Sequence, residues 1–236
     1  MSMITVSEAH ERLRSDNRIR VDDESIDLGD CLGRVLTADV VSSIDVPPAD
    51  NSAMDGYALN REDWPGADKP LEVSQRITAG MPPAPLKKGT AARIFTGADT
   101  PEGADVVVMQ EKCKADGNMV YISTVGNTGA NIRPRGQDIR KGGRVLQKGH
   151  RLRAQDLGLI ASLGIARVEV RQRLKVAIIS TGEELVEPGD PLKPGQIYNS
   201  NRYMLQALLE GWGFEVLDFG ITADDPQIIS GILSEA

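Results

Sequence analysis

The strongest constraint on the fold is an alternation of strand and helix patterns in the last third of the chain. Residues 175–180 are apolar enough for a buried strand, and residues 201–210 gather their leucines and methionine on one helical face. A second strand is predicted at residues 215–219, and a second helix begins at Asp225-Pro226. This order predicts a parallel sheet, with ligands bound beyond the carboxyl ends of its strands.

The middle of the chain has a different sequence pattern, made of short β-type runs. Four of these runs are predicted as strands, at residues 71–79, 91–95, 105–111 and 118–124. The last two flank Asp116-Gly117, a pair typical of a hairpin turn. A possible strand at residues 40–45 is ended by Pro47 and Pro48, because proline cannot continue a hydrogen-bonded ladder. We therefore expect an all-β or β-rich insert.

Helices are predicted on both sides of this insert. Ser7 can cap a short helix that runs to Leu13, and residues 28–36 place apolar side chains at helical spacing. After the insert, a helix is predicted at residues 154–163 and ends at Gly164. With the parallel sheet and the β-rich insert, these helices make the expected fold class α+β multidomain.

Composition argues against several classes of partner and site. The chain has 34 acidic and 27 basic residues, a net charge of -7, which gives no electrostatic footprint for nucleic acid or an anionic membrane. With two cysteines and two histidines, neither a disulfide framework nor a usual zinc site is expected. No apolar run approaches the ~20 residues of a membrane helix, and residues 1–10 lack signal-peptide features. We expect a cytoplasmic protein.

The densest group of candidate site residues begins at Asp45. Residues 45–58 hold three acids, Asp45, Asp50 and Asp55, among residues that favour turns. Side chains of Asp, Asn and Ser satisfy backbone groups in tight turns, so the segment could be only a well-bonded loop. The carboxylates could instead hold a hard divalent cation through oxygen.

Two further segments carry groups that suit an oxyanion. A strand pattern ends in Thr96-Gly97, where a hydroxyl and free backbone amides could hold a phosphate, although an ordinary turn has the same pattern. Residues 131–141 hold four cations, including Arg135, and arginine can bind phosphate with two parallel hydrogen bonds. Such a charge run could equally be a solvated face, and Asp138 within it could simply pair with the cations.

The two predicted parallel strands end in polar turns. Ser180, Thr181 and Glu184 follow the first strand, at the position where α/β units bind ligands. After the second strand, Asp225 is the predicted helix cap, which leaves Asp224 as the freer carboxylate. Each pattern is too short to be specific alone.

Taken together, these segments resemble the molybdopterin molybdenumtransferase family, which includes the bacterial MoeA enzymes and the C-terminal domain of gephyrin. Residues 45–59 look like the most distinctive signature of that family. Four further blocks match in the same order, at residues 93–97 with 101–111, 131–142, 176–185 and 195–202. The resemblance spans nearly the whole chain.

The resemblance implies an elongated homodimer of four-domain subunits. Each site would lie between the β-rich domain of one subunit and the α/β domain of the other. Divided in this way, the chain has four expected parts: an N-terminal helix that packs on the α/β domain (1–22), a helical/β linker and dimerisation domain (23–41 plus 140–172), a β-rich insert domain (42–139), and the truncated start of the α/β molybdopterin-binding domain (173–236).

The activity that the resemblance implies belongs to molybdenum cofactor biosynthesis. Molybdate would be inserted into the dithiolene of adenylylated molybdopterin, with release of AMP. The expected partners are a second copy of the chain, these two substrates, and the adenylyltransferase that supplies the pterin substrate. Neither nucleic acid nor a membrane is expected as a partner.

The resemblance also implies roles for individual residues. The expected catalytic residues are Asp55, Thr96, Asp138 and Glu184, and the residues expected to bind the pterin are Ser180, Thr181, Gly182 and Arg135. The carboxylates of Asp55, Glu184 and Asp224 are expected to hold Mg²⁺, which would neutralise phosphate charge as the bond breaks. The Thr96 hydroxyl could orient an oxyanion.

The sequence departs from the family pattern at its end. The family continues with another strand, a Ser-Gly-Gly-type turn, Lys-Pro-Gly-Lys and Pro-Gly-Asn-Pro segments, and a C-terminal β-barrel domain, which this sequence does not contain. We therefore expect the 236-residue chain to dimerise through its N-terminal regions but not to transfer molybdate alone. The alternative function, a non-catalytic scaffold of the gephyrin type, is harder to build because partner binding there involves the barrel.

Overall fold

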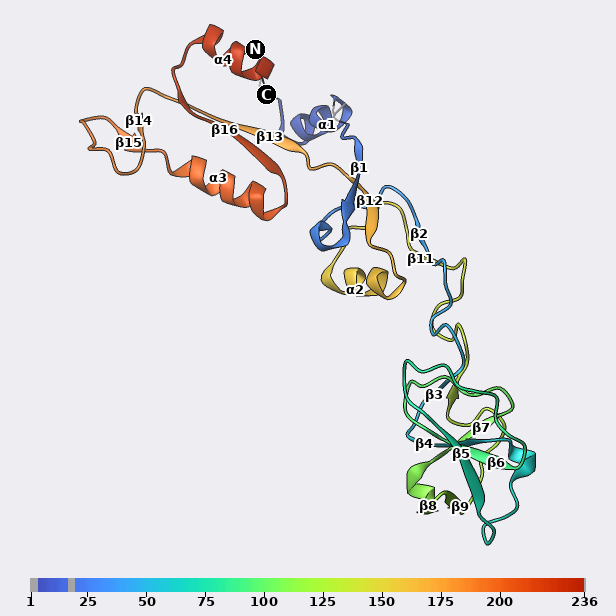
Figure 1. Cartoon of the computed structure of the whole chain (residues 1–236). Helices are drawn as coiled ribbons and strands as arrows, with labels where there is room; N and C mark the ends of the chain where they lie inside the picture. Colours follow the sequence, from blue (N-terminus) through green and yellow to red (C-terminus); the bar gives the residue numbers. More distant parts are fainter. Residues whose placement is uncertain (1–3, 17–19, 236) are drawn as a thin grey trace. The chain divides into compact units, whose positions relative to one another are not determined.

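Two compact units make up the chain in the computed structural model (Figure 1). The structure describes residues 4–16 and 20–235, so the predicted N-terminal part (1–22) lies partly outside the described residues. The insert unit comprises residues 39–147 and 162–164, and the flanking unit comprises residues 1–38, 148–161 and 165–236. The expected boundaries of four separate domains stay a prediction.

The insert unit is built on a six-stranded sheet with the strand order β7-β4-β6-β5-β9-β8. Its strands are β4 (Gly56–Leu59), β5 (Leu71–Ile77), β6 (Thr90–Ile94), β7 (Val106–Met109), β8 (Cys113–Asp116) and β9 (Met119–Ile122). All neighbours pair antiparallel except β5 and β6, which are parallel. The four predicted β-type runs are confirmed as β5, β6, β7 and β9.

Apolar residues fill both faces of this sheet because side chains alternate along each strand. One cluster of buried residues includes Leu59, Val106 and Val108, and the other includes Ala58 and Val107. Every residue of β4 is buried. The sheet is therefore the core of the insert unit, and β4 lies between β7 and β6 within it.

The interpretation of residues 45–58 as an irregular loop is wrong at its end, since β4 begins at Gly56. A Cβ atom built on Gly56 would lie 2.0 Å from the carbonyl oxygen of Val108, so the close approach of β4 and β7 requires glycine. The rest of the segment is irregular apart from β3 (Asn51–Ser52), which pairs with β10 (Ile132–Arg133). Strand β4 has only four residues, and two of them are glycine and alanine, so it gives little signal in the sequence.

The predicted hairpin is correct in its turn but wrong in its first strand. Asp116-Gly117 joins β8 to β9, with Gly117 at φ 59°. The predicted strand at residues 105–111 is instead β7, which ends at Met109 and pairs with β4. A 3-10 turn, η3 (Gln110–Lys112), separates β7 from β8, and another, η2 (Arg61–Asp63), follows β4.

The chain enters and leaves the insert unit on neighbouring strands. The predicted strand at residues 40–45 is shortened to β2 (Val40–Val41), which pairs antiparallel with β11 (Arg144–Leu146). The pairing continues where the Ser42 amide donates to the Gly143 carbonyl at 3.0 Å. This pair of strands is called the two-strand tether below.

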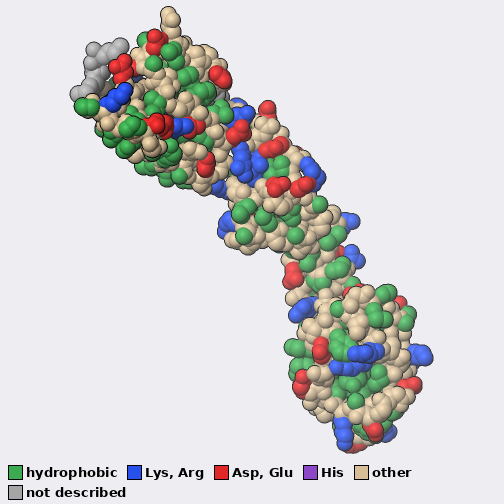
Figure 2. Space-filling view, turned by 60° about the vertical axis from the view of Figure 1, so that its left-hand side comes forward, with side chains coloured by type: hydrophobic (Ala, Val, Ile, Leu, Met, Phe, Trp, Pro, Cys, Tyr) green, Lys and Arg blue, Asp and Glu red, His purple; other side chains and the backbone are tan. Residues whose placement is uncertain are grey.

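The flanking unit contains the predicted β-α-β-α order. The parallel strands are β13 (Lys175–Thr181) and β16 (Glu215–Thr222), joined through α3 (Ser200–Gly211), and α4 (Pro226–Glu235) follows. A short parallel pair, β14 (Leu185–Val186) and β15 (Ile197–Tyr198), lies between β13 and α3 in the chain. In Figure 2, which shows hydrophobic side chains in green, the unit carries several on its surface, and Trp212 at the end of α3 is 57% exposed.

The rest of the flanking unit differs from the prediction at one helix. The helices α1 (Val6–Asp16) and α2 (Ala154–Ser162) confirm the predicted ones, but Ser7 is not the cap of α1: the Thr5 hydroxyl accepts from the Glu8 amide at 3.2 Å. The predicted helix at residues 28–36 is wrong: only the 3-10 turn η1 (Leu28–Asp30) forms, and Gly33 adopts φ 76°, a conformation that ends a helix. In none of the described residues does the structure contain a helix long and apolar enough to cross a membrane.

A strand pair that the sequence analysis missed joins the two ends of the linker region. β1 (Asp23–Asp27) pairs antiparallel with β12 (Arg167–Arg171). Asp23 lies opposite Arg171 and Asp27 opposite Arg167, and both pairs are salt bridges at 2.5 Å. Opposite charges directly across from each other stabilise a strand pair whose residues look too polar for a strand.

Candidate functional site

Asp55 and Thr96 are in direct contact in the insert unit. Oδ1 of Asp55 accepts a hydrogen bond from the Thr96 amide at 2.8 Å and another from the Thr96 hydroxyl at 2.7 Å. Asp55 is half-buried and Thr96 is exposed. Both residues had been predicted as catalytic, and the structure brings them together from segments about forty positions apart.

The sheet positions these two residues. Asp55 directly precedes β4 and Thr96 follows the end of β6, and these strands pair antiparallel, so the start of one lies beside the end of the other. The turn before Asp55 is fixed by Ser52, whose hydroxyl donates to the Met54 carbonyl at 2.6 Å. On the other side, the Gly97 amide donates to the Ser52 carbonyl at 2.8 Å. The carboxylate is therefore held by backbone on both segments.

The Asp55 carboxylate is kept ionised. The hydrogen bond from the Thr96 amide is the largest cause that lowers its pKa, followed by the Thr96 hydroxyl, and the Arg93 charge adds to them. Among the described residues, no group donates to Oδ2. The second carboxylate oxygen is thus free to contact a cation or a substrate donor.

Two arginines flank the aromatic side chain next to Thr96. The guanidinium carbons of Arg93 and Arg76 lie 4.5 and 4.8 Å from the centroid of the Phe95 ring. Arg93 also donates to the Gly56 carbonyl at 2.9 Å and to Gln110 Oε1 at 2.7 Å. The sequence analysis missed this stack, because Arg76 lies in β5, whereas Arg93 and Phe95 lie in and directly after β6.

The basic segment at residues 131–141 is folded around Asp45. Oδ2 of Asp45 accepts from Arg135 Nε at 2.6 Å, and Oδ1 accepts from the Lys141 amide at 2.7 Å. The Lys141 amide and then the Arg135 side chain lower the pKa of Asp45. The Arg135 amide donates to Asp50 Oδ1 at 2.7 Å. Arg135 is thus already paired with a carboxylate, which favours a structural role for part of this charge run.

Asp138 lies on the same segment and is exposed. Its amide donates to the Val46 carbonyl at 2.9 Å. Within the described part of the chain, no hydrogen bond or ion pair links the Asp138 or Arg135 side chain to Asp55 or Thr96. Of the four predicted residues of the insert unit, the structure therefore brings Asp55 and Thr96 together, whereas Arg135 pairs with Asp45.

In the flanking unit, the predicted residues gather where β13 ends. Ser180 and Thr181 are the last residues of β13 and pair with Ile221 and Thr222 of β16. The Glu184 carboxylate folds back over Gly182, whose φ is 145°, and a Cβ built there would meet Oε2 at 2.6 Å. The turn therefore needs glycine at position 182.

Asp224 follows β16, at the carboxyl end next to that of β13, and it is exposed. Asp225 is the cap of α4, as predicted, because its Oδ1 accepts from the Gln227 amide at 2.7 Å. In an open parallel sheet this edge is the expected place for a ligand.

A network beside this edge was missed by the sequence analysis. Nε of Arg202 donates to Asp218 at 2.7 Å, and the Arg202 guanidinium also pairs with Glu187, which accepts from the Tyr203 hydroxyl at 3.1 Å. Asn199, the cap of α3, is 3% exposed, and its Nδ2 has no partner among the described residues. An unpartnered buried donor at this edge is suited to a ligand oxygen.

The described residues contain no group of three or more His, Cys, Asp or Glu side chains that could hold a metal ion. Glu184 and Asp224 lie in the flanking unit and Asp55 in the insert unit. One unit by itself therefore does not supply the expected Mg²⁺ ligands, and the shared site stays a prediction.

Replacing Thr96 by Val is expected to raise the pKa of Asp55 toward the ordinary aspartate value without restoring it. The substitution removes the hydroxyl donor but keeps the amide donor, which is the larger cause of the lowered pKa. Carboxyl chemical shifts followed by NMR over acid pH measure the change. Because the folded pKa is depressed, the stabilisation by the ionised form is lost as pH falls through it, and Thr96→Val loses it at higher pH. An unchanged pKa would contradict the assignment, and Thr96→Ser is the control that keeps both donors.

Comparisons with known proteins match both parts of the chain. The family model of the MoeA N-terminal region (domain I and II) matches residues 4–164, and the model of a probable molybdopterin binding domain matches residues 177–236. The chain is 43% identical over 220 residues to the molybdopterin molybdenumtransferase of Nostoc sp., covering 91% of this chain and 50% of the relative. It is 40% identical over 226 residues to the Haemophilus influenzae protein of the same name, covering 94% and 55%.

A solved structure agrees with these sequence matches. The crystal structure of the molybdopterin biosynthesis moeA protein from Pyrococcus horikoshii OT3 superposes with a TM-score of 0.89 and 37% identity, covering 100% of this chain and 64% of that one. The chain spans about half the length of the curated relatives that it matches.

Proposed function

The chain belongs to the MoeA family, and from that premise we propose that it acts in molybdenum cofactor biosynthesis as part of a molybdopterin molybdenumtransferase. The proposed reaction inserts molybdate into the dithiolene of adenylylated molybdopterin and releases AMP. The observation that carries the proposal is the contact between Asp55 and Thr96. It supplies a fixed, ionised carboxylate with one free oxygen on the family signature segment.

The chemistry needs groups that manage negative charge. Both substrates are anions, so an unpaired carboxylate at the site would repel them unless it contacts a cation or a donor group of the substrate. Asp55 fits this role because Thr96 already satisfies Oδ1 and leaves Oδ2 for that contact. Arg93 and Arg76 lie close by and offset the charge of the bound anions.

The flanking unit is proposed to hold the pterin substrate. Ser180 and Thr181 end β13 and Gly182 follows it, at the ligand-binding edge of a parallel sheet. The buried, unpartnered Nδ2 of Asn199, at the start of α3, is a further donor. Arg135 and Asp138 of the insert unit are proposed to act from a second subunit, in line with a site shared between two chains.

Magnesium and dimer formation are part of the same proposal. Mg²⁺ prefers carboxylate oxygens and would supply neutralisation of phosphate charge, with Asp55 from one subunit and Glu184 and Asp224 from the other as its ligands. A homodimer is required by this arrangement. A cytoplasmic location and contact with the adenylyltransferase that delivers the substrate complete the proposal.

The test is AMP release from adenylylated molybdopterin by the purified full-length parent enzyme. Release is expected to need molybdate, because insertion and cleavage are proposed to be one reaction, and to need Mg²⁺. Omission of each component in turn gives the matched controls. AMP release at the same rate without molybdate would mean that the enzyme is only an adenylate hydrolase, and this result would overturn the proposed function.

A further inference from the structure

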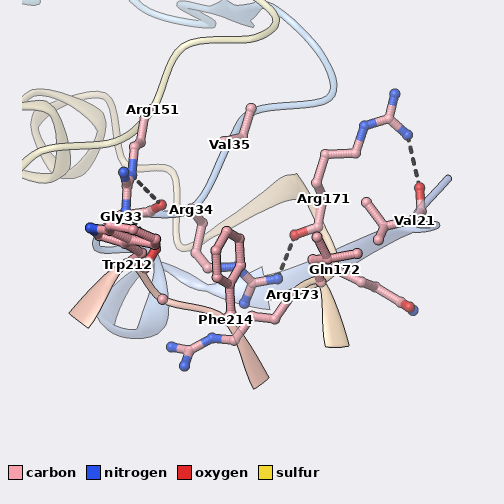
Figure 3. Close-up of a pocket in the computed structure, with 12 residues that line it drawn as sticks. Val21, Gly33, Arg34, Val35, Arg151, Arg171, Gln172, Arg173, Trp212 and Phe214 are labelled. Carbon is pink, nitrogen blue, oxygen red and sulfur yellow. Dashed lines mark hydrogen bonds between the residues drawn. The ribbon is translucent and has the colours of Figure 1, made fainter. Parts of the chain in front are cut away.

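A pocket of about 440 Å³ in the flanking unit contains none of the predicted site residues (Figure 3). Its volume is in the range of small-molecule sites. Four of its described lining residues are arginines, Arg34, Arg151, Arg171 and Arg173, and none is acidic. The chain has a net charge of -7, so this local excess of positive charge is unusual and favours the binding of an anion.

Two of the four arginines are partly neutralised at the edge of the pocket. Arg171 pairs with Asp23 at 2.5 Å, and Arg34 pairs with Glu24 and donates to the Arg171 carbonyl at 2.6 Å. Arg34 is thereby fixed, as the dashed line in Figure 3 shows. These ion pairs fix Arg34 and Arg171 in the wall of the pocket, so Arg151 and Arg173 are the arginines that can bind a ligand.

Arg151 and Arg173 have no carboxylate partner among the described residues. Arg151 donates to two backbone acceptors, the Gly33 carbonyl at 3.0 Å and the Trp212 carbonyl at 2.9 Å. These two bonds hold its charge in place without neutralising it. Arg173 is exposed and makes no hydrogen bond to any described residue, so its whole guanidinium can bind an oxyanion with two parallel hydrogen bonds.

The pocket also offers an aromatic wall. Trp212 and Phe214 meet edge to face, with ring centroids 6.4 Å apart and an interplanar angle of 85°. Trp212 is 57% exposed, so part of its ring is open to a ligand. A flat ring can stack there while an attached anion reaches an arginine.

We propose that this pocket binds a small oxyanion carried on a planar ring. The arginines recognise a phosphate or a carboxylate, and the aromatic wall selects for the ring. This site is separate from the proposed transferase site, and the inference does not depend on that function.

Trp212 makes the proposal directly testable, since the chain has only two tryptophans and the other, Trp64, lies in the insert unit. In a Trp64→Phe background, phenyl phosphate is expected to quench the emission of Trp212 in a saturable way. Inorganic phosphate alone and phenol alone should bind about tenfold more weakly or less. Benzoate in a parallel titration distinguishes a carboxylate site from a phosphate site.

Arg173→Gln is expected to weaken binding of phenyl phosphate about tenfold, while Arg144→Gln, which removes an exposed arginine of the insert unit, leaves it unchanged. Calorimetric titration of the unsubstituted chain checks the same order of affinities without Trp64→Phe. The proposal is overturned if phenyl phosphate binds no better than phosphate and benzoate no better than acetate, or if both arginine variants behave alike.

Discussion

In the full-length parent protein, Asp55→Asn is expected to lower turnover by about a hundredfold or more while the melting temperature stays within a few degrees. Asparagine keeps the shape of the side chain, and its Oδ1 can still accept from the Thr96 amide and hydroxyl. What is lost is the negative charge and the acceptor at Oδ2. The measurements are molybdate-dependent AMP release and thermal unfolding on the same preparations.

Asp63→Asn is the matched control for this variant. Asp63 is half-buried in the same unit, and its carboxylate also accepts a backbone hydrogen bond, from the Gly89 amide at 2.9 Å. It carries no predicted role, so its turnover should be unchanged. If Asp55→Asn lost melting temperature in proportion to activity, the carboxylate would be a structural group of the loop rather than a catalytic one.

Gly56→Ala is expected to destabilise the insert unit by about 3 kcal/mol, which lowers its melting temperature by about 10 °C or more. The added Cβ would lie 2.0 Å from the Val108 carbonyl oxygen, and a backbone atom cannot rotate away. Strand β4 is hydrogen-bonded to β6 on one side and β7 on the other, so it has little room to shift. Fluorescence of Trp64, in the same unit, reports the unfolding.

Gly158→Ala gives the opposite expectation and serves as the control. Gly158 is exposed within α2, and a Cβ built there meets nothing within 4 Å. Alanine should stabilise the helix by about 0.5–1 kcal/mol, because glycine loses more backbone entropy on folding. A Gly56→Ala protein that melts like the unsubstituted one would contradict the close approach of β4 and β7.

Local patterns predicted the elements whose signal lies within a few residues. The apolar face of α3 and the apolar run of β13 were recognised because each pattern lies within a few consecutive residues. Strands β1 and β12 were missed, because their charged residues pair with each other across more than a hundred positions. Residues 28–36 show the converse failure: apolar spacing predicted a helix that Gly33, at φ 76°, does not allow.

The site could be predicted only as separate parts. The acidic segment that ends at Asp55 and the turn at Thr96 were each recognised as candidates, but their contact depends on the pairing of β4 with β6. The arginine-lined pocket gave no signal at all. Its arginines come from positions 34, 151, 171 and 173, and only the fold brings these separate segments together.

The two-strand tether has a consequence for the order of folding and for proteolysis. Val41 and Arg144 are paired although they are roughly one hundred residues apart, so pairing them early would close a long loop at a large entropic cost. The folded insert sheet already brings these ends together, so the tether should form late, as a result of that sheet. A single nick in either tether strand would leave the insert unit attached through the other. A protease must therefore cut both tether strands to release the insert unit. The two-strand tether resists proteolytic release better than a single connecting segment would.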